Sequence, residues 1–458
     1  MHTRQLSGFK DPYLVLQSLK GRRHPFLLES RLLNHGIGRY SFLSADPFLT
    51  LSAKGNTITQ KGHGIIRTER GCPLQALDTL LQKYALFANA SLPFGGGAVG
   101  YLGYELKKHI EVLPECTSDD LAFPDLWFGF YEGALVFDHI ENKVFAAAYN
   151  IKGNSENLLE KLSHWYKNAN TAANPGKNQH GKDPDKKIAS TLDEKSYIRA
   201  VQKTLDYIGS GDIYQANIST RFSTNLTHPP LETYGRLREL NKAPFAAYLE
   251  TGEHQVLSSS PERFLKISRD ILEMRPIKGT APRGTTPEKD AANKDKLLTS
   301  KKDQAELLMI VDLIRNDLGR ICKTGSVKVT GIYDLESYAT VHHLSATIKG
   351  IRKKNTSLKD IIKATFPGGS ITGAPKVRSM EIIDELEPTH RGVYTGAIGY
   401  FGFDGQADLN IAIRTIVAHK GRGYFHVGSG IVADSSPEAE YQESLSKGKA
   451  LLQTLLNH

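Results

Sequence analysis

Residues 393–432, VYTGAIGYFGFDGQADLNIAIRTIVAHKGRGYFHVGSGIV, decide the fold class of this chain. Apolar stretches separated by glycine-rich turns predict three strands here, over Val393 to Phe403, Asp408 to His419 and Tyr424 to Val432. A helix over Pro437 to Leu456 follows, with Ser436 as its N-cap and proline in its first turn. Strands joined by such short turns pair in antiparallel fashion. The stretch therefore indicates an α+β protein with mostly antiparallel sheet, and it excludes a doubly wound parallel sheet.

The rest of the chain alternates helices and short strands on both sides of one polar segment. Residues 168–187 contain no large apolar residue and are rich in Asn, Gly, Pro and Lys, which is linker composition. This segment separates an N-terminal region, residues 1–167, from a C-terminal region, residues 188–458, as a linker or an exposed loop. Periodicity in the C-terminal region predicts further helices over Glu194 to Ser210, Asp303 to Ile321, Ser357 to Phe366 and Ala374 to Leu386.

The composition is that of an ordinary globular protein of a reducing compartment. Of the 458 residues, 40% are hydrophobic and 23% are charged. No apolar run approaches the roughly 20 residues of a membrane helix, and residues 1–20 lack the layout of a signal peptide, so we expect no membrane partner. The three cysteines are widely spaced and odd in number, which predicts neither a disulfide framework nor a zinc site and favours a cytoplasmic location.

The net charge of +9 arises from 58 basic and 49 acidic residues. A basic chain is a candidate for nucleic-acid binding. The basic residues are scattered, however, and the stripe of interleaved aromatic and basic residues typical of a single-strand binder is missing. We therefore expect no nucleic-acid partner, and an anionic small-molecule substrate accounts for part of the excess charge.

Lys278 stands in the segment Arg275-Pro276-Ile277-Lys278-Gly279-Thr280, directly after an apolar run. The proline fixes the backbone, and Gly279 allows a ligand to approach the main chain closely. A lysine held in this way is a fixed cation for an acidic substrate, or a nucleophile if its pKa is lowered. The alternative is an ordinary surface lysine at the end of a strand.

Several acidic residues are placed where they can share a site with this lysine. Glu440, Glu443 and Lys447 lie on one face of the last helix, after a glycine-rich strand end that leaves room for a ligand. The helix over Asp303 to Ile321 carries Glu306, with Arg315 and Arg320 further along. Two helices that each present a glutamate can share Mg²⁺, which prefers carboxylates, water and substrate oxygens. The alternative is a solvated helix face with an ordinary Glu443–Lys447 pair.

Glu262 follows a Ser-Pro turn and precedes Lys278 by 16 residues. This separation suits a hairpin that returns the lysine to the neighbourhood of the acid. An acid and a lysine at one site are candidates for a general acid and a nucleophile.

Taken together, these segments resemble the family of chorismate-utilising enzymes. The matching blocks keep their order through most of the C-terminal region, at residues 211–217, 260–263, 276–280, 306–317, 343–344, 367–376, 428–432 and 440–443. The N-terminal half resembles the more variable N-terminal region of the family, through residues 26–30 and 96–101. The resemblance implies a four-layer α/β/β/α sandwich. Its two large, orthogonally packed antiparallel sheets would intertwine both regions of the chain and hold the active site in the cleft between them.

The resemblance also implies a role for each candidate residue. Glu306 and Glu443 would ligate Mg²⁺, with Glu440 close to it, and the metal would hold a carboxylate of chorismate. Glu262 would protonate the departing 4-hydroxyl group. The substrate pocket would be formed by Gln215, Gly279, Arg315, Arg320, His343, Ser370, Tyr394, Arg414, Gly428, Gly430 and Lys447.

Two positions separate the members of this family. Members that add water to chorismate use a lysine to activate the water, and the matching position here is Gln215, whose amide is no base. At Lys278, members that form anthranilate typically have alanine, whereas members that aminate C4 of chorismate typically have this lysine. The lysine would add at C2 and expel the 4-hydroxyl group, and ammonia would then add at C4 and expel the lysine.

The expected activity is therefore amination of chorismate at C4, a step towards 4-aminobenzoate and folate. No cysteine nucleophile in a glutaminase context is visible, so the ammonia would come from a separate glutamine amidotransferase subunit in a heterodimer. Formation of anthranilate is the alternative, and a non-catalytic basic binding protein on the same scaffold is the more distant one. The segment Phe26-Leu27-Leu28-Glu29-Ser30 adds the hypothesis of a tryptophan pocket that includes Glu29 and Ser30.

Overall fold

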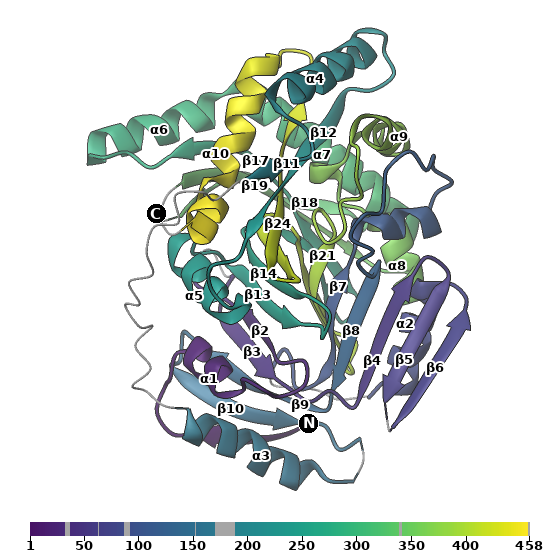
Figure 1. Cartoon of the computed structure of the whole chain (residues 1–458), viewed down its shortest axis with the longest axis vertical. Coiled ribbons are helices and arrows are strands. Elements are labelled where there is room, and N and C mark those ends of the chain that lie inside the picture. The colour runs from purple at the N-terminus through teal and green to yellow at the C-terminus, as the bar shows by residue number, and fades with distance from the viewer. Residues whose placement is uncertain are drawn as a thin grey trace.

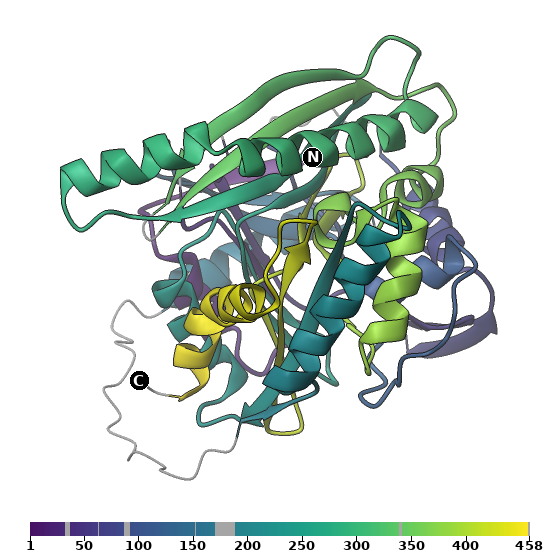
Figure 2. The ribbon, with the colours of Figure 1, turned by 90° about the horizontal axis from the view of Figure 1, so that it is seen from above.

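The computed structural model describes residues 1–32, 37–62, 64–86, 92–151, 153–169, 188–338 and 341–456. Two large antiparallel sheets form the centre of the molecule, and helices pack on the outer side of each sheet (Figure 1 and Figure 2). The expected fold class, α+β with two large antiparallel sheets between layers of helices, is confirmed.

The first sheet crosses the molecule from the N-terminal strand to the middle of the chain. Within the described residues its order is β1 (His2–Leu6), β10 (Lys143–Ala148), β9 (Gly133–Asp138), β3 (Tyr40–Ser44), β2 (Phe26–Glu29), β13 (Phe245–Glu250), β14 (Gln255–Ser260), β23 (Thr415–His419), β24 (Arg422–Ile431), β12 (Gln215–Asn225) and β11 (Ala189–Ser190), with β20 (Gly373–Ala374) paired to β12.

The second sheet is built in the same interleaved manner. Within the described residues its order is β17 (Ile277–Pro282), β19 (Val341–Ile351), β16 (Ile271–Arg275), β15 (Arg263–Ser268), β22 (Ala407–Ile411), β21 (Ala397–Gly402), β7 (Gly97–Leu102), β8 (Leu126–Tyr131), β4 (Leu49–Lys54), β5 (Thr57–Gly62) and β6 (Ile65–Arg70), with β18 (Lys328–Ser337) paired to β19.

Both sheets combine strands from the two regions of the chain. In the first sheet β2 pairs with β13, where Leu28 lies opposite Ala247. In the second sheet β7 pairs with β21, where Gly100 lies opposite Gly399. The two regions are therefore intertwined. The predicted linker at residues 168–187 lies, from residue 170 onward, outside the described residues.

The helices divide between the two outer faces. The first sheet is covered by α1 (Pro12–Ser18), α3 (Ser155–Asn168), α4 (Glu194–Gly209), α5 (Pro230–Leu240), α9 (Lys376–Leu386) and α10 (Pro437–Leu456). The second sheet is covered by α2 (Pro73–Lys83), α6 (Pro287–Thr299), α7 (Lys301–Ile321) and α8 (Leu358–Thr365), and short 3-10 turns occur at η1 (Tyr104–His109) and η2 (Gly369–Ile371). Figure 2 shows the green helices α6 and α7 lying along the green strands β17 to β19. Among the described residues, no helix combines the length and the apolar composition that crossing a membrane requires.

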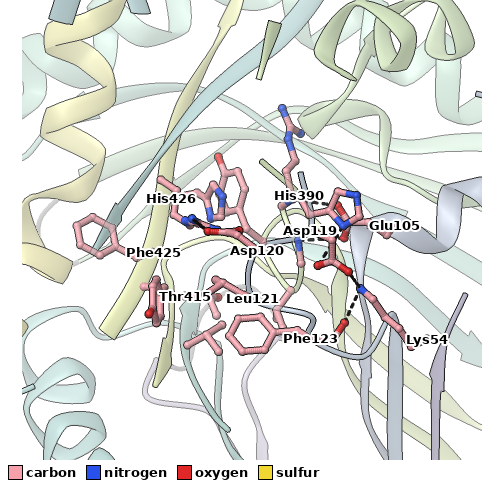
Figure 3. A pocket seen from close by; sticks show the side chains of 17 residues that line it. Lys54, Glu105, Asp119, Asp120, Leu121, Phe123, His390, Thr415, Phe425 and His426 are labelled. Atoms are coloured by element: carbon pink, nitrogen blue, oxygen red, sulfur yellow. Dashed lines mark hydrogen bonds and ion pairs between the residues drawn. The ribbon is translucent and has the colours of Figure 1, made fainter. Parts of the chain in front are cut away.

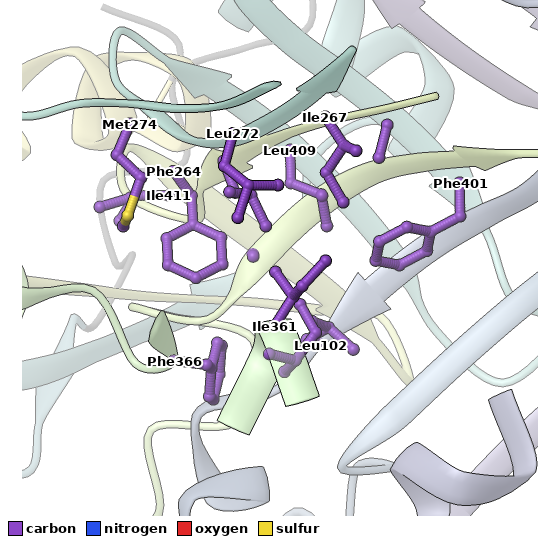
Figure 4. Close-up of a cluster of buried hydrophobic side chains, with 14 of the residues drawn as sticks. Leu102, Phe264, Ile267, Leu272, Met274, Ile361, Phe366, Phe401, Leu409 and Ile411 are labelled. Carbon is purple, nitrogen blue, oxygen red and sulfur yellow. The ribbon is translucent and has the colours of Figure 1, made fainter. Parts of the chain in front are cut away.

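Three hydrophobic layers follow from this arrangement. One apolar cluster joins the inner faces of the sheets through residues such as Phe42, Tyr101 and Val256. A second cluster lies between the second sheet and its helices. Figure 4 shows part of it, with Phe264 and Leu409 of the sheet near Ile361 of α8. A third cluster and a smaller one attach the remaining helices to the first sheet.

One predicted strand proved to be two. The segment Asp408 to His419 divides into β22, in the second sheet, and β23, in the first sheet. The break falls at Arg414, whose φ of +53° lies in the left-handed region and ends the extended conformation. The prediction of a single strand was wrong because periodicity does not reveal a residue that turns the chain from one sheet to the other. The predicted strand Val393 to Phe403 likewise begins only at Ala397, after Thr395 with φ of +59°.

Candidate active site

Lys278 and Gly430 bring the two sheets together at one point. Lys278 lies on β17 of the second sheet, and Gly430 lies on β24 of the first sheet. A Cβ atom placed on Gly430 would lie 2.9 Å from the Lys278 Nζ and 2.9 Å from the Gln215 Nε2. The lysine amine and the glutamine amide therefore both point at the bare backbone of Gly430. The candidate active site lies at this contact between the sheets, where the family resemblance places it.

The polar groups at this contact are poorly satisfied by the protein itself. Gln215 is fully buried, and neither its Oε1 nor its Nε2 has a hydrogen-bond partner. Within the part of the chain that the structure describes, the side chains of Lys278 and Glu306 make no hydrogen bond and no ion pair. An unpaired polar group out of water costs roughly 1–3 kcal/mol. Several such groups gathered at one place are a candidate site for a polar ligand, an ion or bound water.

The environment of Lys278 favours its neutral form. Burial lowers the pKa of the Lys278 amine, and the positive charge of Lys447 lowers this pKa further. Glu306, Glu262 and Glu443 act in the opposite direction but do not reverse the shift in the pKa of Lys278. Lowering the pKa of a lysine increases the fraction of the amine that is neutral and can act as a nucleophile.

Glu262 lies beside this lysine, as the spacing predicted. Its Oε1 accepts hydrogen bonds from the Ser370 Oγ at 2.6 Å and from the backbone N–H of Ile277 at 3.3 Å. Burial raises the pKa of Glu262 to about 7, although these hydrogen bonds and the charge of Lys278 oppose the shift. Near neutral pH the carboxyl group is thus partly protonated, as a general acid must be.

His343 and Gly279 close the site from the second sheet. The His343 Nδ1 lies 2.8 Å from the Thr280 Oγ1, and the ring of His343 is buried against Tyr338. Burial, together with the charge of Arg414, lowers the pKa of His343 to about 4, so the ring is neutral at physiological pH. Gly279 has φ of +83°, a conformation that favours glycine, and a Cβ there would lie 3.0 Å from Asp303.

The last helix contributes a cation and an acid that pair with each other. The Lys447 Nζ lies 2.8 Å from the Glu443 Oε1 and 3.4 Å from the backbone oxygen of Gly428. Arg414 donates a hydrogen bond to the backbone oxygen of Lys447. Burial alone would raise the pKa of Glu443, but the adjacent Lys447 holds this pKa below its usual value. Glu443 and Lys447 therefore form the i,i+4 ion pair that was the alternative to a metal site in the sequence analysis. Both side chains are partly exposed, so the pair lies at the edge of the site.

The three predicted metal ligands surround the site without forming a ready-made cluster. Glu440 is buried, and its Oε1 accepts a hydrogen bond from the Ser435 Oγ at 2.6 Å. Burial raises the pKa of Glu306, and the negative charge of Glu440 acts in the same direction on this pKa. Within the described residues, no group of three or more His, Cys, Asp or Glu side chains is assembled to hold a metal ion. The carboxylates thus share one electrostatic environment but do not converge on one point.

Two predicted substrate residues lie away from the contact. Arg315 pairs with Asp312 at 2.9 Å on the exposed side of α7. It follows Glu306 by nine residues, which is about half a turn out of phase on a helix of 3.6 residues per turn. Arg320 pairs with Asp317 at 3.1 Å and donates to the backbone of Ala364. It follows Glu306 by 14 residues, so it lies about 21 Å along the helix.

The residues of the hypothetical tryptophan pocket are satisfied within the protein. Glu29 is buried and accepts hydrogen bonds from Arg238 and from the Tyr234 hydroxyl group, the latter at 3.1 Å. The Ser30 Oγ donates to the backbone oxygen of Leu32 at 3.2 Å. The Glu29 carboxylate is therefore already occupied by an arginine.

Two polar residues near the site escaped the sequence analysis. Asn217 lies opposite Gly430 in the β12–β24 ladder, and His426 stacks on the predicted Tyr394 with ring centroids 4.9 Å apart. The available signal was the alternation of polar residues at 215, 217, 219 and 221, which marks one face of a strand as polar.

Comparison with known proteins gives a consistent result. A family model described as "chorismate binding enzyme" matches residues 32–453. Aminodeoxychorismate synthase component 1 of Bacillus subtilis is 39% identical over 465 residues, which cover 99% of this chain and 98% of that protein. Anthranilate synthase component 1 of Acetivibrio thermocellus is 37% identical and covers 94% of this chain and 90% of its own length. The crystal structure of anthranilate synthase component I from Streptococcus pneumoniae superposes with a TM-score of 0.79 at 32% identity, over 98% of this chain and 99% of that one.

Proposed function

The chain belongs to the family of chorismate binding enzymes, and on this basis we propose that it is the large component of an aminodeoxychorismate synthase. It would convert chorismate and ammonia to 4-amino-4-deoxychorismate. The observation that carries the proposal is the position of Lys278, which lies between the sheets beside Gly430, with burial lowering the pKa of its amine. The similarity to the Bacillus subtilis aminodeoxychorismate synthase component over nearly the whole chain supports it.

The chemistry proceeds in two displacements. The neutral Lys278 amine adds at C2 of chorismate, the ring double bonds shift towards C4, and the 4-hydroxyl group leaves as water after taking a proton from Glu262. Ammonia then adds at C4, the double bonds return, and the lysine amine leaves C2. Ammonia thereby enters on the face from which the hydroxyl group departed, because two displacements restore the configuration. Glu262, whose pKa burial raises to about 7, has the proton that the first step needs.

Gln215 favours ammonia over water as the second nucleophile. Its buried amide is no base, so it cannot activate water in the way that a lysine at this position would. Its Oε1, which lacks a partner, can accept a hydrogen bond from ammonia.

The carboxylates fit Mg²⁺ in their chemistry. Glu306 makes no ion pair among the described residues, and burial raises its pKa, so a cation would relieve an unfavourable burial. Glu306, Glu440 and Glu443 are the residues that would hold the ion, and oxygen ligands of this kind are what Mg²⁺ prefers. When bound, the ion would fix a carboxylate of chorismate and neutralise its charge.

A second protein would supply the ammonia. The curated relatives named above are each a component 1, and the proposed partner of this chain is a glutamine amidotransferase subunit. The reaction with free ammonium salt would then replace the partner in a test with the isolated chain.

Formation of anthranilate is the second candidate. The similarity to the Acetivibrio thermocellus and Streptococcus pneumoniae anthranilate synthase components favours it. Incubation of the purified chain with chorismate, Mg²⁺ and ammonium, followed by chromatography and mass analysis, separates the candidates. Aminodeoxychorismate, which a lyase turns into 4-aminobenzoate, is the expected product. Fluorescent anthranilate would establish the second candidate, and chorismate binding without turnover, even with the partner present, would indicate a binding protein.

A further inference from the structure

A small cavity lies next to Tyr394. Its volume is about 20 Å³, which holds one molecule as large as water. Figure 3 shows charged side chains at its edge, where Lys54 lies 2.7 Å from Asp119. Arg221, which also lines the cavity, forms an ion pair with Asp120. Because these charges are paired and the volume is small, the cavity favours bound water over a larger ligand.

The surface of the molecule offers a different feature, the exposed edge of the second sheet. The strand β6 ends the order of this sheet and, among the described residues, pairs only with β5. Figure 1 shows β6 on the outer side of the sheet, beyond β5. Ile65 and Ile66 at the start of β6 are 67% and 68% exposed. An exposed strand edge of this kind can accept another strand.

The backbone of β6 presents hydrogen-bonding groups on its outer side at every second residue. The N–H of Gly71 donates to the backbone oxygen of Asn56 at 2.9 Å, and these residues continue the regular register of the β5–β6 ladder. Hydrogen-bonded and non-hydrogen-bonded pairs alternate in an antiparallel ladder, so every second residue before Gly71 also bonds to β5. The residues between them, Ile66, Thr68 and Arg70, therefore direct their N–H and C=O groups away from the sheet.

The side chains of β6 complement a second copy of the same strand in antiparallel pairing. With a two-fold axis at Thr68, this residue lies opposite its own copy, and Arg67 lies opposite Glu69 of the second copy. Within one chain Arg67 and Glu69 form an ion pair at 2.7 Å, with side chains that are 70% and 37% exposed. Pairing of two copies would add two ion pairs between the chains, and opposite charges at such positions are stabilising.

The position of the axis at Thr68 is favoured over its neighbour for two reasons. An axis at Arg67 would place the two copies of this arginine opposite each other, where like charges repel. The axis at Thr68 also brings all three outward-facing residues into hydrogen-bonded pairs, because Ile66 then lies opposite Arg70 of the second copy. The charges and the backbone groups thus select the same register.

The surroundings of β6 leave room for a second copy. The helix α2 packs against β5, and in a continuous sheet the two copies of β5 would be three strand spacings apart, about 14 Å. A helix with its side chains has a diameter of roughly 10 Å, so the two copies of α2 would not collide. Ile65 would lie opposite Gly71 of the second copy, which has no side chain to obstruct it.

We propose that two copies of this chain associate through β6, so that the second sheet of one copy continues into the second sheet of the other. This inference goes beyond the proposed function and does not depend on it. A strand of six residues provides a small contact compared with the roughly 1,200–2,000 Å² of a stable interface, so the association is weak and depends on concentration. Lys278 lies on β17, at the other end of the order of this sheet, and remains accessible to substrate.

Sedimentation velocity of the full chain at a series of protein concentrations tests the association. We expect a reversible equilibrium between monomer and dimer. Hydrogen–deuterium exchange then locates the contact, since peptides that cover β6 should exchange more slowly at high than at low protein concentration. A chain that is monomeric at every concentration would overturn the proposal, and so would a dimer without added protection at β6.

Thr68→Pro tests the backbone pairing. Proline removes the outward N–H of residue 68 but no hydrogen bond to β5, so the monomer should keep its melting temperature. Two hydrogen bonds at the two-fold axis are lost, and we expect the dissociation constant of the dimer to rise at least roughly tenfold. An unchanged dissociation constant in the folded variant would show that the copies associate elsewhere.

Reversal of the charges tests the register. Arg67→Glu and Glu69→Arg each place like charges opposite each other in the dimer, and we expect each to raise the dissociation constant about tenfold. The double variant restores opposite charges and should restore association. Lys143→Glu, in the first sheet, changes the net charge as Arg67→Glu does at a side chain that is 44% exposed, and serves as the matched control. Failure of the double variant to recover would overturn the proposed pairing.

Discussion

Gly430 on β24 and Lys278 on β17 face each other across the two sheets, and the missing side chain of the glycine is what leaves room for the lysine amine. A Cβ at Gly430 would lie 2.9 Å from the Lys278 Nζ, closer than non-bonded atoms of this kind tolerate. The amine can reach its observed position only while residue 430 has no side chain. The placement of the Lys278 amine is thus decided by the opposite sheet.

Replacing Gly430 with alanine should therefore displace the amine while leaving the fold intact. Gly430 is not among the residues with a left-handed φ, so alanine brings no backbone strain. A shift of the nucleophile by about 1 Å costs roughly 100-fold in rate. We expect a loss of kcat of that order, measured with chorismate and ammonium. The control is Gly209→Ala at the end of α4, where no atom lies within 4 Å of the added methyl group and kcat should not change.

Substitution of Lys278 tests its role as a nucleophile. Lys278→Ala and Lys278→Arg should both abolish the formation of aminodeoxychorismate, because neither side chain can add at C2 and leave again. The arginine variant keeps the positive charge, so residual activity in this variant alone would mean that the lysine acts only as a cation. Lys278→Ala also removes a buried amine without an ion-pair partner, and we expect its melting temperature to be equal to or higher than that of the unsubstituted chain. Formation of anthranilate by this variant would show that Lys278 selects the position of amination.

The raised pKa of Glu262 predicts how activity and stability depend on pH. As a general acid the residue must be protonated, so kcat should fall as the pH rises through about 7. Glu262→Gln should lower kcat by at least about 100-fold and remove this limb of the pH profile. A profile of unchanged shape in this variant would assign the limb to another group.

The sign of the stability change follows from the same shift. The pKa of the Glu262 carboxyl group is 4.5 when the chain is unfolded, and burial raises it to about 7 in the folded protein. As the pH rises, the unfolded chain therefore loses this proton before the folded protein does. The free energy of unfolding therefore decreases between about pH 4.5 and pH 7 and then stays constant. Glu262→Gln should gain stability relative to the unsubstituted chain in this window, by roughly 3 kcal/mol at most. Denaturant titrations at pH 4.5 and pH 8 measure the difference.

Glu443 and Glu306 can be tested as Mg²⁺ ligands by titration of the metal. Glu443→Gln and Glu306→Gln should each weaken Mg²⁺ binding by about tenfold or more and lower turnover in parallel. Glu438→Gln, on the same helix but exposed, serves as the control. Calorimetry with Mg²⁺ in the presence of chorismate gives a readout that does not depend on turnover. A Mg²⁺ titration that is unaltered in either variant would remove that residue from the proposed ligand set.

The buried pair of Glu29 and Arg238 should be important for stability. Glu29→Gln removes the buried charge partner of Arg238 and leaves only the more exposed Asp11 and Glu239, and we expect a loss of about 3 kcal/mol in the free energy of unfolding. The matched control is Glu239→Gln, because Glu239 pairs with the same arginine but is 54% exposed and should cost less than about 1 kcal/mol. Because Arg238 already occupies the Glu29 carboxylate, added tryptophan should not raise the melting temperature. A clear increase would support the tryptophan pocket.

The proximity of Glu262 to Lys278 and the bounds of the last helix could be predicted from the sequence because their signals are local. Glu262 and Lys278 are separated by a single hairpin, β15 to β16, and short hairpins return neighbouring residues to one place. The last helix was predicted with its observed bounds, since Ser436 and Pro437 mark its start. These features require only that the chain folds on itself over a few tens of residues.

The remaining features depend on contacts that periodicity cannot reveal. The approach of Gly430 to Lys278 joins two sheets, and nothing in either segment specifies the partner. Arg315 was assigned to the substrate pocket, although its position on α7 turns it to the opposite side from Glu306. The division of residues 408–419 between the two sheets arises at one residue with an unusual φ. The cavity next to Tyr394 exists only because loops and strands from seven stretches of the chain meet there.

Because strands of the two regions alternate in both sheets, the two regions must fold together. They do not have to be joined in one polypeptide. Residues 1–169 contain strands such as β2 and β7 whose hydrogen-bonding neighbours, β13 and β21, lie beyond residue 188. Neither fragment alone can complete a sheet, so each would expose unpaired strand edges and aggregate. Expressed together, the fragments 1–169 and 188–458 should recognise each other by these edges and restore activity. The two fragments could therefore serve as a split reporter. If each fragment is fused to a different protein, binding of those two proteins to each other would promote reassembly and restore activity.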